Sequence, residues 1–209
     1  MSRGRRGARA GVGRIRFGAR ETRDLLIAWL ALGMAFTLFL LVTSGAGLSP
    51  VGLLALVGTS LFVELLVLSL LTAGVGFLLH ELAHKVVAIR FGQAAEFRAD
   101  YTMLALAVGA GLAGFLFAAP GAVYHRGYLT PQENAFIALA GPFANALLTL
   151  AFYPLFLLGG FLGDVGQLGV TINAALAGFN MIPFGPLDGR KVKDWSLVGF
   201  TLAFLLCAG

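Results

Sequence analysis

The sequence predicts an all-α polytopic membrane protein, with about five transmembrane helices and an irregular or β segment that dips into the membrane. Of its 209 residues, 58% are hydrophobic and only 12% are charged, whereas an ordinary soluble domain has about 25% charged residues. So few charges cannot cover a water-facing surface, and lipid must cover much of the chain. The high hydrophobic content also excludes an intrinsically disordered chain. The single cysteine, Cys207, excludes an intramolecular disulfide.

A basic segment precedes the first apolar run. It holds eight of the 15 basic residues: Arg3, Arg5, Arg6, Arg9, Arg14, Arg16, Arg20 and Arg23. Cations on a short flank of a membrane helix resist translocation. We therefore expect a disordered cytoplasmic tail at 1–23 and a single membrane-embedded domain at 24–209. A tail that binds RNA or lipid headgroups is the alternative; otherwise we expect the lipid bilayer, and no nucleic acid, as a partner.

Charge placement orders the membrane crossings. The uncharged run from Leu25 to Thr43 is long enough to cross a hydrocarbon core of about 30 Å, and we expect an uncleaved anchor because no convincing cleavage site follows it. If Arg23 and Lys85 are both cytoplasmic, one helix over about 61–89 must return. Three further apolar stretches follow at 101–119, 135–158 and 165–182, and a short last helix is expected at 195–208.

The stretch 101–119 is the one that we expect not to span the membrane. Three full crossings between Arg98 and Lys191 would place the second basic cluster outside, against the charge rule. Glycines and a proline interrupt this stretch, and the pattern over 115–124 is typical of extended chain. Such backbone persists at membrane depth only where its amides pair within the protein or line a wet cavity.

Two of the three histidines lie in the motif His80-Glu81-Leu82-Ala83-His84. A spacing of four residues on a helix puts both imidazoles on one face, where they can bind one Zn²⁺. Glu81 would then lie beside the metal without binding it, positioned to accept a proton from water and to deliver it to a leaving amine. The alternative is a polar helix end at the membrane interface, but this leaves three polar groups unsatisfied near hydrocarbon.

A catalytic zinc needs a third protein ligand and an open position for water. Four other acidic residues suit this role less well. Glu64 is too far along the helix, Asp164 is on the expected outer side, and Glu96 and Asp100 fall in a polar cytoplasmic stretch. Asp188 is favoured because prolines and glycines over 183–189 break the preceding helix and let the chain turn a carboxylate inwards. An exposed Asp in an ordinary turn is the alternative interpretation, and His125 is the reserve ligand.

These segments together resemble the site-2 protease family of intramembrane zinc metalloproteases. The likeness runs over about 61–193 and rests on His80-Glu81-x-x-His84, on Ala140-Gly-Pro-Phe-Ala-Asn145, and on Asn180-x-x-Pro183 followed by Asp188-Gly189. It implies a three-helix catalytic core that binds one zinc ion through His80, His84 and Asp188. It also implies that Glu81 is the catalytic acid/base and that Asn180 helps to hold the substrate or the developing oxyanion.

The resemblance implies hydrolysis of peptide bonds in or near the transmembrane helices of membrane-protein substrates, as in regulated intramembrane proteolysis. It further implies that 91–124 forms strands partly sunk in the membrane, which pair with an unwound substrate. We expect a multi-pass protein of a prokaryotic plasma membrane, with a cytoplasmic N-terminus and without the PDZ or nucleotide-sensing domain of many members.

Two other functions stay open from the sequence. One is a carrier of zinc or another divalent cation, which would use His80, His84 and Asp188 as a transit site, because ionisable residues within membranes often mark ion paths. The other is a proteolytically inactive scaffold that binds transmembrane helices through the glycine-rich faces at 74–76 and 109–114.

Overall fold

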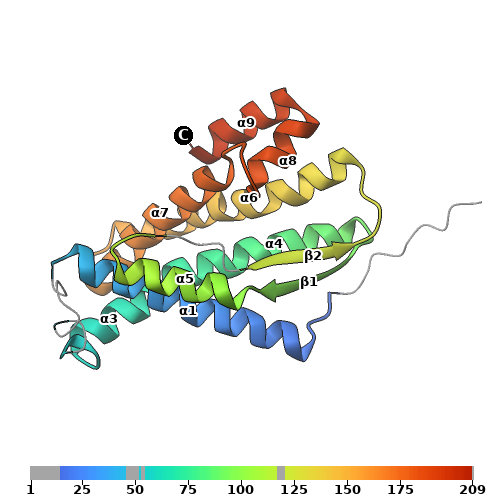
Figure 1. Cartoon of the computed structure of the whole chain (residues 1–209). Helices are drawn as coiled ribbons and strands as arrows, with labels where there is room; N and C mark the ends of the chain where they lie inside the picture. The colour runs from blue at the N-terminus through green and yellow to red at the C-terminus, as the bar shows by residue number, and fades with distance from the viewer. Residues whose placement is uncertain (1–14, 46–51, 53–54, 117–120, 209) are drawn as a thin grey trace, which may run out of the picture.

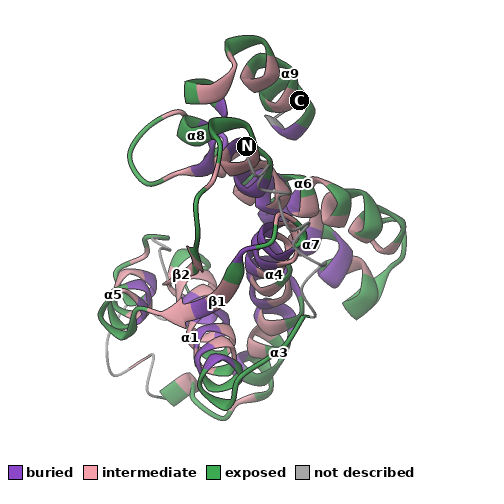
Figure 2. Cartoon of the chain, turned by 90° about the vertical axis from the view of Figure 1, so that its right-hand side faces the viewer, coloured by how far each residue is buried: buried purple, intermediate pink, exposed green. Residues whose placement is uncertain are grey.

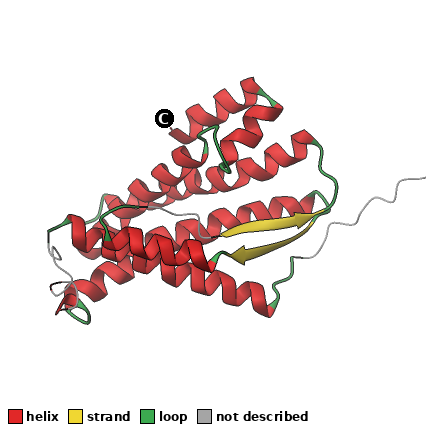
Figure 3. Ribbon diagram, in the orientation of Figure 1, coloured by secondary structure: helices red, strands yellow, loops and turns green. Residues whose placement is uncertain are grey.

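The chain folds into a mostly helical structure with one small sheet. A computed structural model describes residues 15–45, 52, 55–116 and 121–208. The helices are α1 (Ala19–Thr43), α3 (Ser60–Ser69), the π-helical turn η1 (Leu70–Gly74), α4 (Val75–Arg90), α5 (Tyr101–Leu112), α6 (Pro131–Phe156), α7 (Gly160–Asn180), α8 (Asp188–Trp195) and α9 (Leu197–Ala208) (Figure 1). The strands β1 (Ala94–Ala99) and β2 (Gly121–Arg126) pair antiparallel. Figure 3 shows how far helix dominates, which confirms the mostly helical class.

Three helices in the described part of the chain are long and apolar enough to cross a membrane. They cover Ala19–Thr43, Ser60–Arg90 and Pro131–Phe156. α7 forms where we predicted another span, but it is not one of these three helices, and it contains Asp164, Gln167 and Asn173. α5 and α9 are apolar but shorter. The number of transmembrane helices therefore stays a prediction.

The predicted tail at 1–23 lies partly outside the described residues, which begin at residue 15. α1 begins at Ala19, inside that tail, because its first turns make contacts with the sheet. Glu21 and Asp24 are each only 1% exposed, and their carboxylates accept hydrogen bonds from backbone N–H groups of β1. Residues 19–23 are thus helical and not disordered.

The second long helix is continuous from Ser60 to Arg90 but contains the π-helical turn η1. Trp29 of α1 packs on this turn. Its indole Nε1 donates to the Leu70 carbonyl at 3.0 Å, and its ring covers Gly74, where a Cβ would lie 2.5 Å from the ring. Such turns are frequent at functional sites, and this one ends shortly before the His80 motif.

The stretch 101–119 is only partly as predicted. Residues 101–112 form the helix α5, which the Asp100 side chain caps by accepting from the Met103 N–H. The prediction of strands throughout 91–124 is therefore wrong in its middle, where the cap and the packing of Gly111 on α1 favour helix. The strands β1 and β2 form on either side of α5. The 12 residues of α5 would span about 18 Å, less than the thickness of a hydrocarbon core.

Buried residues line the facing sides of the long helices and of β1, as Figure 2 shows. One core cluster joins α1, α4, β1 and α5, and consists of Ala28, Leu32, Phe77, Phe97 and Leu104. The outer faces carry exposed apolar side chains, among them Leu30, Leu150 and Leu205. Lipid tails are as apolar as leucine, so these faces suit contact with a bilayer.

Candidate metal centre

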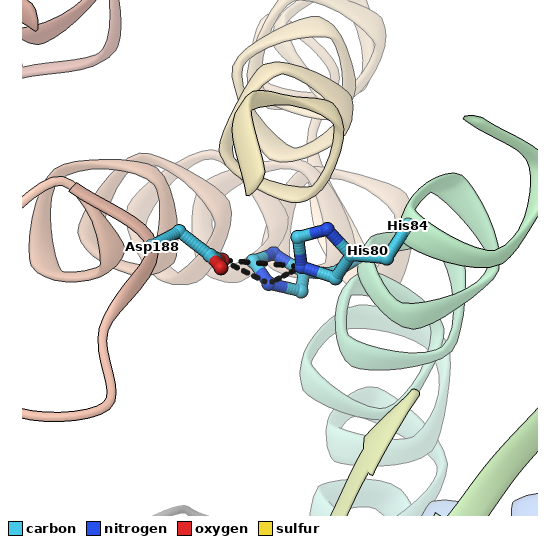
Figure 4. A group of neighbouring side chains, drawn as sticks. All are labelled: His80, His84 and Asp188. Carbon is cyan, nitrogen blue, oxygen red and sulfur yellow. Dashed lines mark hydrogen bonds and ion pairs between the residues drawn. The ribbon is translucent and has the colours of Figure 1, made fainter. Parts of the chain in front are cut away.

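Three buried side chains from two distant segments meet at one point (Figure 4). α4 supplies His80 and His84, one helical turn apart, and the first residue of α8 supplies Asp188. Asp188 Oδ2 lies 3.4 Å from His80 Nε2 and 3.1 Å from His84 Nε2, and the two Nε2 atoms are 3.0 Å apart. Among the described residues these three form a group that could hold a metal ion.

The hydrogen bonds at the far side of each imidazole determine which nitrogen carries the hydrogen. His84 Nδ1 lies 2.7 Å from the Ile137 carbonyl oxygen, which can only accept, so Nδ1 is the donor. His80 Nδ1 lies 2.6 Å from Asn145 Oδ1. The Asn145 Nδ2 donates to the Gly76 carbonyl, which leaves Oδ1 as the acceptor for His80. Both Nε2 atoms therefore present lone pairs.

This donor set fits a divalent cation. Two nitrogen lone pairs and a carboxylate oxygen repel one another at such distances unless a positive charge lies among them. Two imidazoles and a carboxylate are ligands that zinc accepts, and a hydrogen bond from Nδ1 to an oxygen is the usual support for a zinc-bound histidine. The residues present therefore suit zinc.

Gly141 of α6 provides the space beside these donor atoms. A Cβ at this position would lie 2.5 Å from Nε2 of both His80 and His84. Any side chain here would occupy the space at the donor atoms. The next residue, Pro142, lies inside the helix and cannot donate a backbone hydrogen bond.

Local backbone turns Asp188 towards α4. Gly185, in the turn between α7 and α8, has φ +58°, a conformation that favours glycine. Gly189 packs on the Met181 backbone, so closely that a Cβ there would collide with the Met181 carbonyl. The second carboxylate oxygen, Oδ1, accepts a hydrogen bond from Lys191 Nζ at 3.1 Å. Lys191 thus holds Asp188 from the side opposite the imidazoles.

Glu81 is buried next to this group without joining it. Its carboxylate lies near the backbone N–H of Val123, in β2. Glu81 therefore lies near both the donor group and β2, and its role as the acid/base stays a prediction.

Asn180 and His125, the remaining predicted residues, are not among the three grouped donors. Asn180 is the last residue of α7, and its side chain donates to the Leu176 carbonyl of the same helix at 3.0 Å. Its role with substrate stays a prediction. His125, the reserve ligand, is in β2 and is not one of the three grouped donors. Burial, together with the charge of Lys191, lowers the pKa of the His125 imidazole.

Sequence reasoning gave no role to two buried asparagines of the site. Asn145 of α6 and Asn173 of α7 are fully buried, and Asn145 contacts His80 directly. A signal for both was present, because an asparagine inside an apolar helix must find a hydrogen-bond partner. The partner, however, depends on how three helices pack, and this was not predictable from spacing.

The two edges of the sheet differ. The N–H groups of Phe97 and Ala99 donate to Glu21 and Asp24 of α1, so they point away from β2. Their partners across the sheet, Val123 and Gly121, must likewise point their backbone groups away from β1, because opposite residues of an antiparallel pair share the same orientation. α1 thus covers the outer edge of β1, whereas the outer edge of β2 faces Glu81.

Comparison with known proteins identifies relatives. No family model and no solved structure matches the chain. The chain is 40% identical over 186 residues to the protein named "Putative zinc metalloprotease MJ0611" of Methanocaldococcus jannaschii, and the match covers 87% of each chain. It is 27% identical over 150 residues to "Putative zinc metalloprotease YwhC" of Bacillus subtilis, covering 59% of this chain and 66% of that protein. With its group of donors that could hold one metal ion, the chain belongs to this family of zinc metalloproteases.

Proposed function

We propose that the chain is an intramembrane zinc metalloprotease of the site-2 protease type, which hydrolyses peptide bonds in or near transmembrane helices of other membrane proteins. One observation carries the proposal. His80, Glu81 and His84 are buried in a helix within a 31-residue apolar segment, and Asp188 joins the two histidines there. A hydrolytic site of a soluble protease has no need of such a segment.

In this proposal His80, His84 and Asp188 hold one zinc ion. When bound, zinc supplies a Lewis acid that polarises a carbonyl and lowers the pKa of water. The Nδ1 hydrogen bonds of the two histidines keep their Nε2 lone pairs directed to one place. Lys191 holds the Asp188 carboxylate in position.

Glu81 acts as the general acid/base. It takes a proton from the attacking water as the new C–O bond forms, and it delivers that proton to the leaving nitrogen as the C–N bond breaks. Its carboxylate is buried away from bulk water and lies near the Val123 N–H of β2. Asn180 would have to leave its bond to Leu176 before its amide could support the substrate carbonyl.

The outer edge of β2 is the proposed place for the substrate. A substrate helix hides its carbonyls in its own hydrogen bonds, so part of it must unwind before cleavage. An unwound segment can then add to a strand edge through backbone hydrogen bonds. The edge of β2 lies next to Glu81 and is left free by α1, which supports this placement.

The rest of the predicted organisation belongs to the same proposal. α4, α6 and α7 form a three-helix catalytic core within about 61–193, in a single membrane-embedded domain at 24–209. The N-terminus lies in the cytoplasm of a prokaryotic cell and the plasma membrane surrounds the helices. Exposed leucines on α1, α6 and α9 support the contact with lipid.

Cleavage of a membrane substrate by the purified chain in proteoliposomes tests the proposal. We expect the wild-type chain to cut a reconstituted transmembrane substrate. Glu81→Gln should lose at least about 100-fold in rate while it keeps its zinc. Glu64→Gln is the matched control, because Glu64 lies on the same long helix and is exposed.

Two results would contradict the proposal. Cleavage by Glu81→Gln at the wild-type rate would show that Glu81 is not the general acid/base. Zinc flux into the vesicles without any proteolysis would favour the carrier.

A further inference from the structure

α7 contributes no metal donor, yet it reaches the site through two buried amides. Asn145 Nδ2 donates to Asn173 Oδ1 at 2.8 Å, and Asn173 Nδ2 donates to the Gly169 carbonyl at 2.8 Å. Both asparagines are 0% exposed. We call Asn145 and Asn173 the amide pair. Together they connect the backbone of α7 to the imidazole of His80 on α4.

Each side-chain amide of the pair has only one possible orientation of its oxygen and nitrogen atoms. The carbonyls of Gly169 and Gly76 can only accept, so the Nδ2 atoms of the pair must point at them. Asn173 then presents Oδ1, which accepts from Asn145. With its Nδ2 used in this way, Asn145 turns Oδ1 towards His80 Nδ1 at 2.6 Å.

The direction matters because it selects the tautomer of His80. An Asn145 side chain turned over would present its NH₂ group to Nδ1, and a neutral imidazole would then carry its hydrogen on Nε2. An Nε2–H group has no lone pair for a metal. Asn145 Nδ2 donates two hydrogen bonds. The bond to the Gly76 carbonyl is 3.2 Å long and the bond to Asn173 Oδ1 is 2.8 Å long, so Asn173 provides the shorter of the two bonds that orient the Asn145 amide.

We propose that Asn173 is a positioning residue for the metal centre: by accepting from Asn145 it holds the Asn145 amide in one orientation, and so keeps His80 as the Nδ1–H tautomer that can bind zinc. The inference rests on the proposed function in one respect, that His80 is a zinc ligand. Asn173 acts through Asn145 and touches neither substrate nor metal donor.

The packing of the helices is built around this contact. A Cβ on Gly76 of α4 would lie 2.5 Å from Asn173 Oδ1, so only glycine lets α4 and α7 approach this closely. Asn173 is also held by the carbonyl of Gly169, on its own helix. α7 therefore influences His80 through a chain of hydrogen bonds, although it supplies no metal ligand itself.

The test uses the purified chain and has two measurements. Zinc affinity is measured by competition with a chelator. The tautomer of each histidine is measured by ¹⁵N NMR of the metal-free chain labelled at histidine; with only three histidines in the sequence, His84→Ala and His125→Ala chains assign the signals.

The variants separate the hydrogen bonds of Asn173 from its volume. Asn173→Leu has nearly the same shape but neither accepts nor donates, and Asn173→Ala is a smaller second variant in case leucine disturbs folding. Asn173→Asp, neutral when buried, restores one acceptor and one donor. Thr171→Val is the matched control, because Thr171 is exposed on the same helix and bonds only to the Gln167 carbonyl.

We expect Asn173→Leu and Asn173→Ala to bind zinc about 10–100-fold more weakly and to show hydrogen on Nε2 of His80 in part of the molecules. Asn173→Asp should bind as the wild type does, and so should Thr171→Val. Wild-type affinity and an unchanged His80 tautomer in either the Leu or the Ala variant would overturn the inference. If His80→Ala leaves zinc binding unchanged, the proposed function itself fails. This result can be told apart from failure of the inference, which is read from the Asn173 variants.

Discussion

Lys85 donates to both carboxylate oxygens of Glu21, at 2.6 Å each, and both side chains are 1% exposed. The pair links α4, immediately after the last histidine of the motif, to the start of α1. Glu21 also accepts from the Phe97 N–H of β1 at 3.0 Å. One buried ion pair thus holds together the helix that carries two metal donors and the sheet that lies beside Glu81.

Loss of one member of this pair should destabilise the protein strongly. A buried ion without its partner costs about 3–5 kcal/mol, so we expect Glu21→Ala to lower the free energy of unfolding by this amount. Glu96→Ala is the control, since Glu96 pairs with Arg98 but is 41% exposed and should cost less than about 1 kcal/mol. Denaturant titration in detergent gives both values.

A double variant separates the cost of leaving a buried charge unpaired from the cost of losing the contact between Glu21 and Lys85. In Glu21→Leu combined with Lys85→Met no charge is left unpaired, so the stability should return in part. Equal stability losses for Glu21→Ala and Glu96→Ala would show that the buried pair contributes no more than a surface pair.

The sequence allowed the metal donors to be predicted better than their surroundings. The four-residue spacing of His80 and His84 matches the period of a helix, so one local rule was sufficient. Asp188 required only that prolines and glycines break a helix before it. Asp188 was then favoured as the third ligand because the other acidic residues were less suitable, and in the structure it contacts both histidines of α4.

The supporting contacts were not predictable, because each depends on tertiary packing. Glu21 was assigned to the tail at 1–23 and Asp24 to the start of the membrane domain, although both carboxylates cover the edge of β1. Residues 101–112 contain two glycines, Gly109 and Gly111, which weakened a helix prediction. The Asp100 cap was a local signal for that helix.

Gly141→Ala should abolish metal binding. The added Cβ would lie 2.5 Å from both Nε2 atoms, and the imidazoles cannot move away without losing their Nδ1 hydrogen bonds. We expect a loss of at least about 100-fold in zinc affinity. Gly109→Ala on α5 is the control, because nothing lies within 4 Å of a Cβ there. The zinc content per chain is measured after purification. Equal zinc contents in Gly141→Ala and Gly109→Ala would contradict the prediction.

Asp188→Ala should remove zinc from the purified chain, because two imidazoles alone are an incomplete zinc site. Lys191→Met should have a smaller effect, about 10-fold in affinity, because Lys191 only holds Oδ1 of the carboxylate. Asp194→Ala is the control on the same helix, since its side chain is 69% exposed. Zinc affinity measured by chelator competition checks the order. An Asp188→Ala chain with its full zinc content would show that another group is the third ligand.

His125→Pro should reduce substrate cleavage without loss of zinc. His125 lies opposite Ala95, in the same alternation as Val123 and Gly121, so its backbone N–H points to the outer edge of β2. Proline fits an edge strand but removes that donor, and we expect kcat/KM for a transmembrane substrate to fall about 5–10-fold, as for the loss of one hydrogen bond of 1–1.5 kcal/mol. His125→Ala keeps the N–H and is the matched control. It should cleave as the wild type does and keep its zinc, which also tests whether His125 is a ligand. Equal kcat/KM for the Pro and Ala variants would exclude strand addition at this position of the β2 edge.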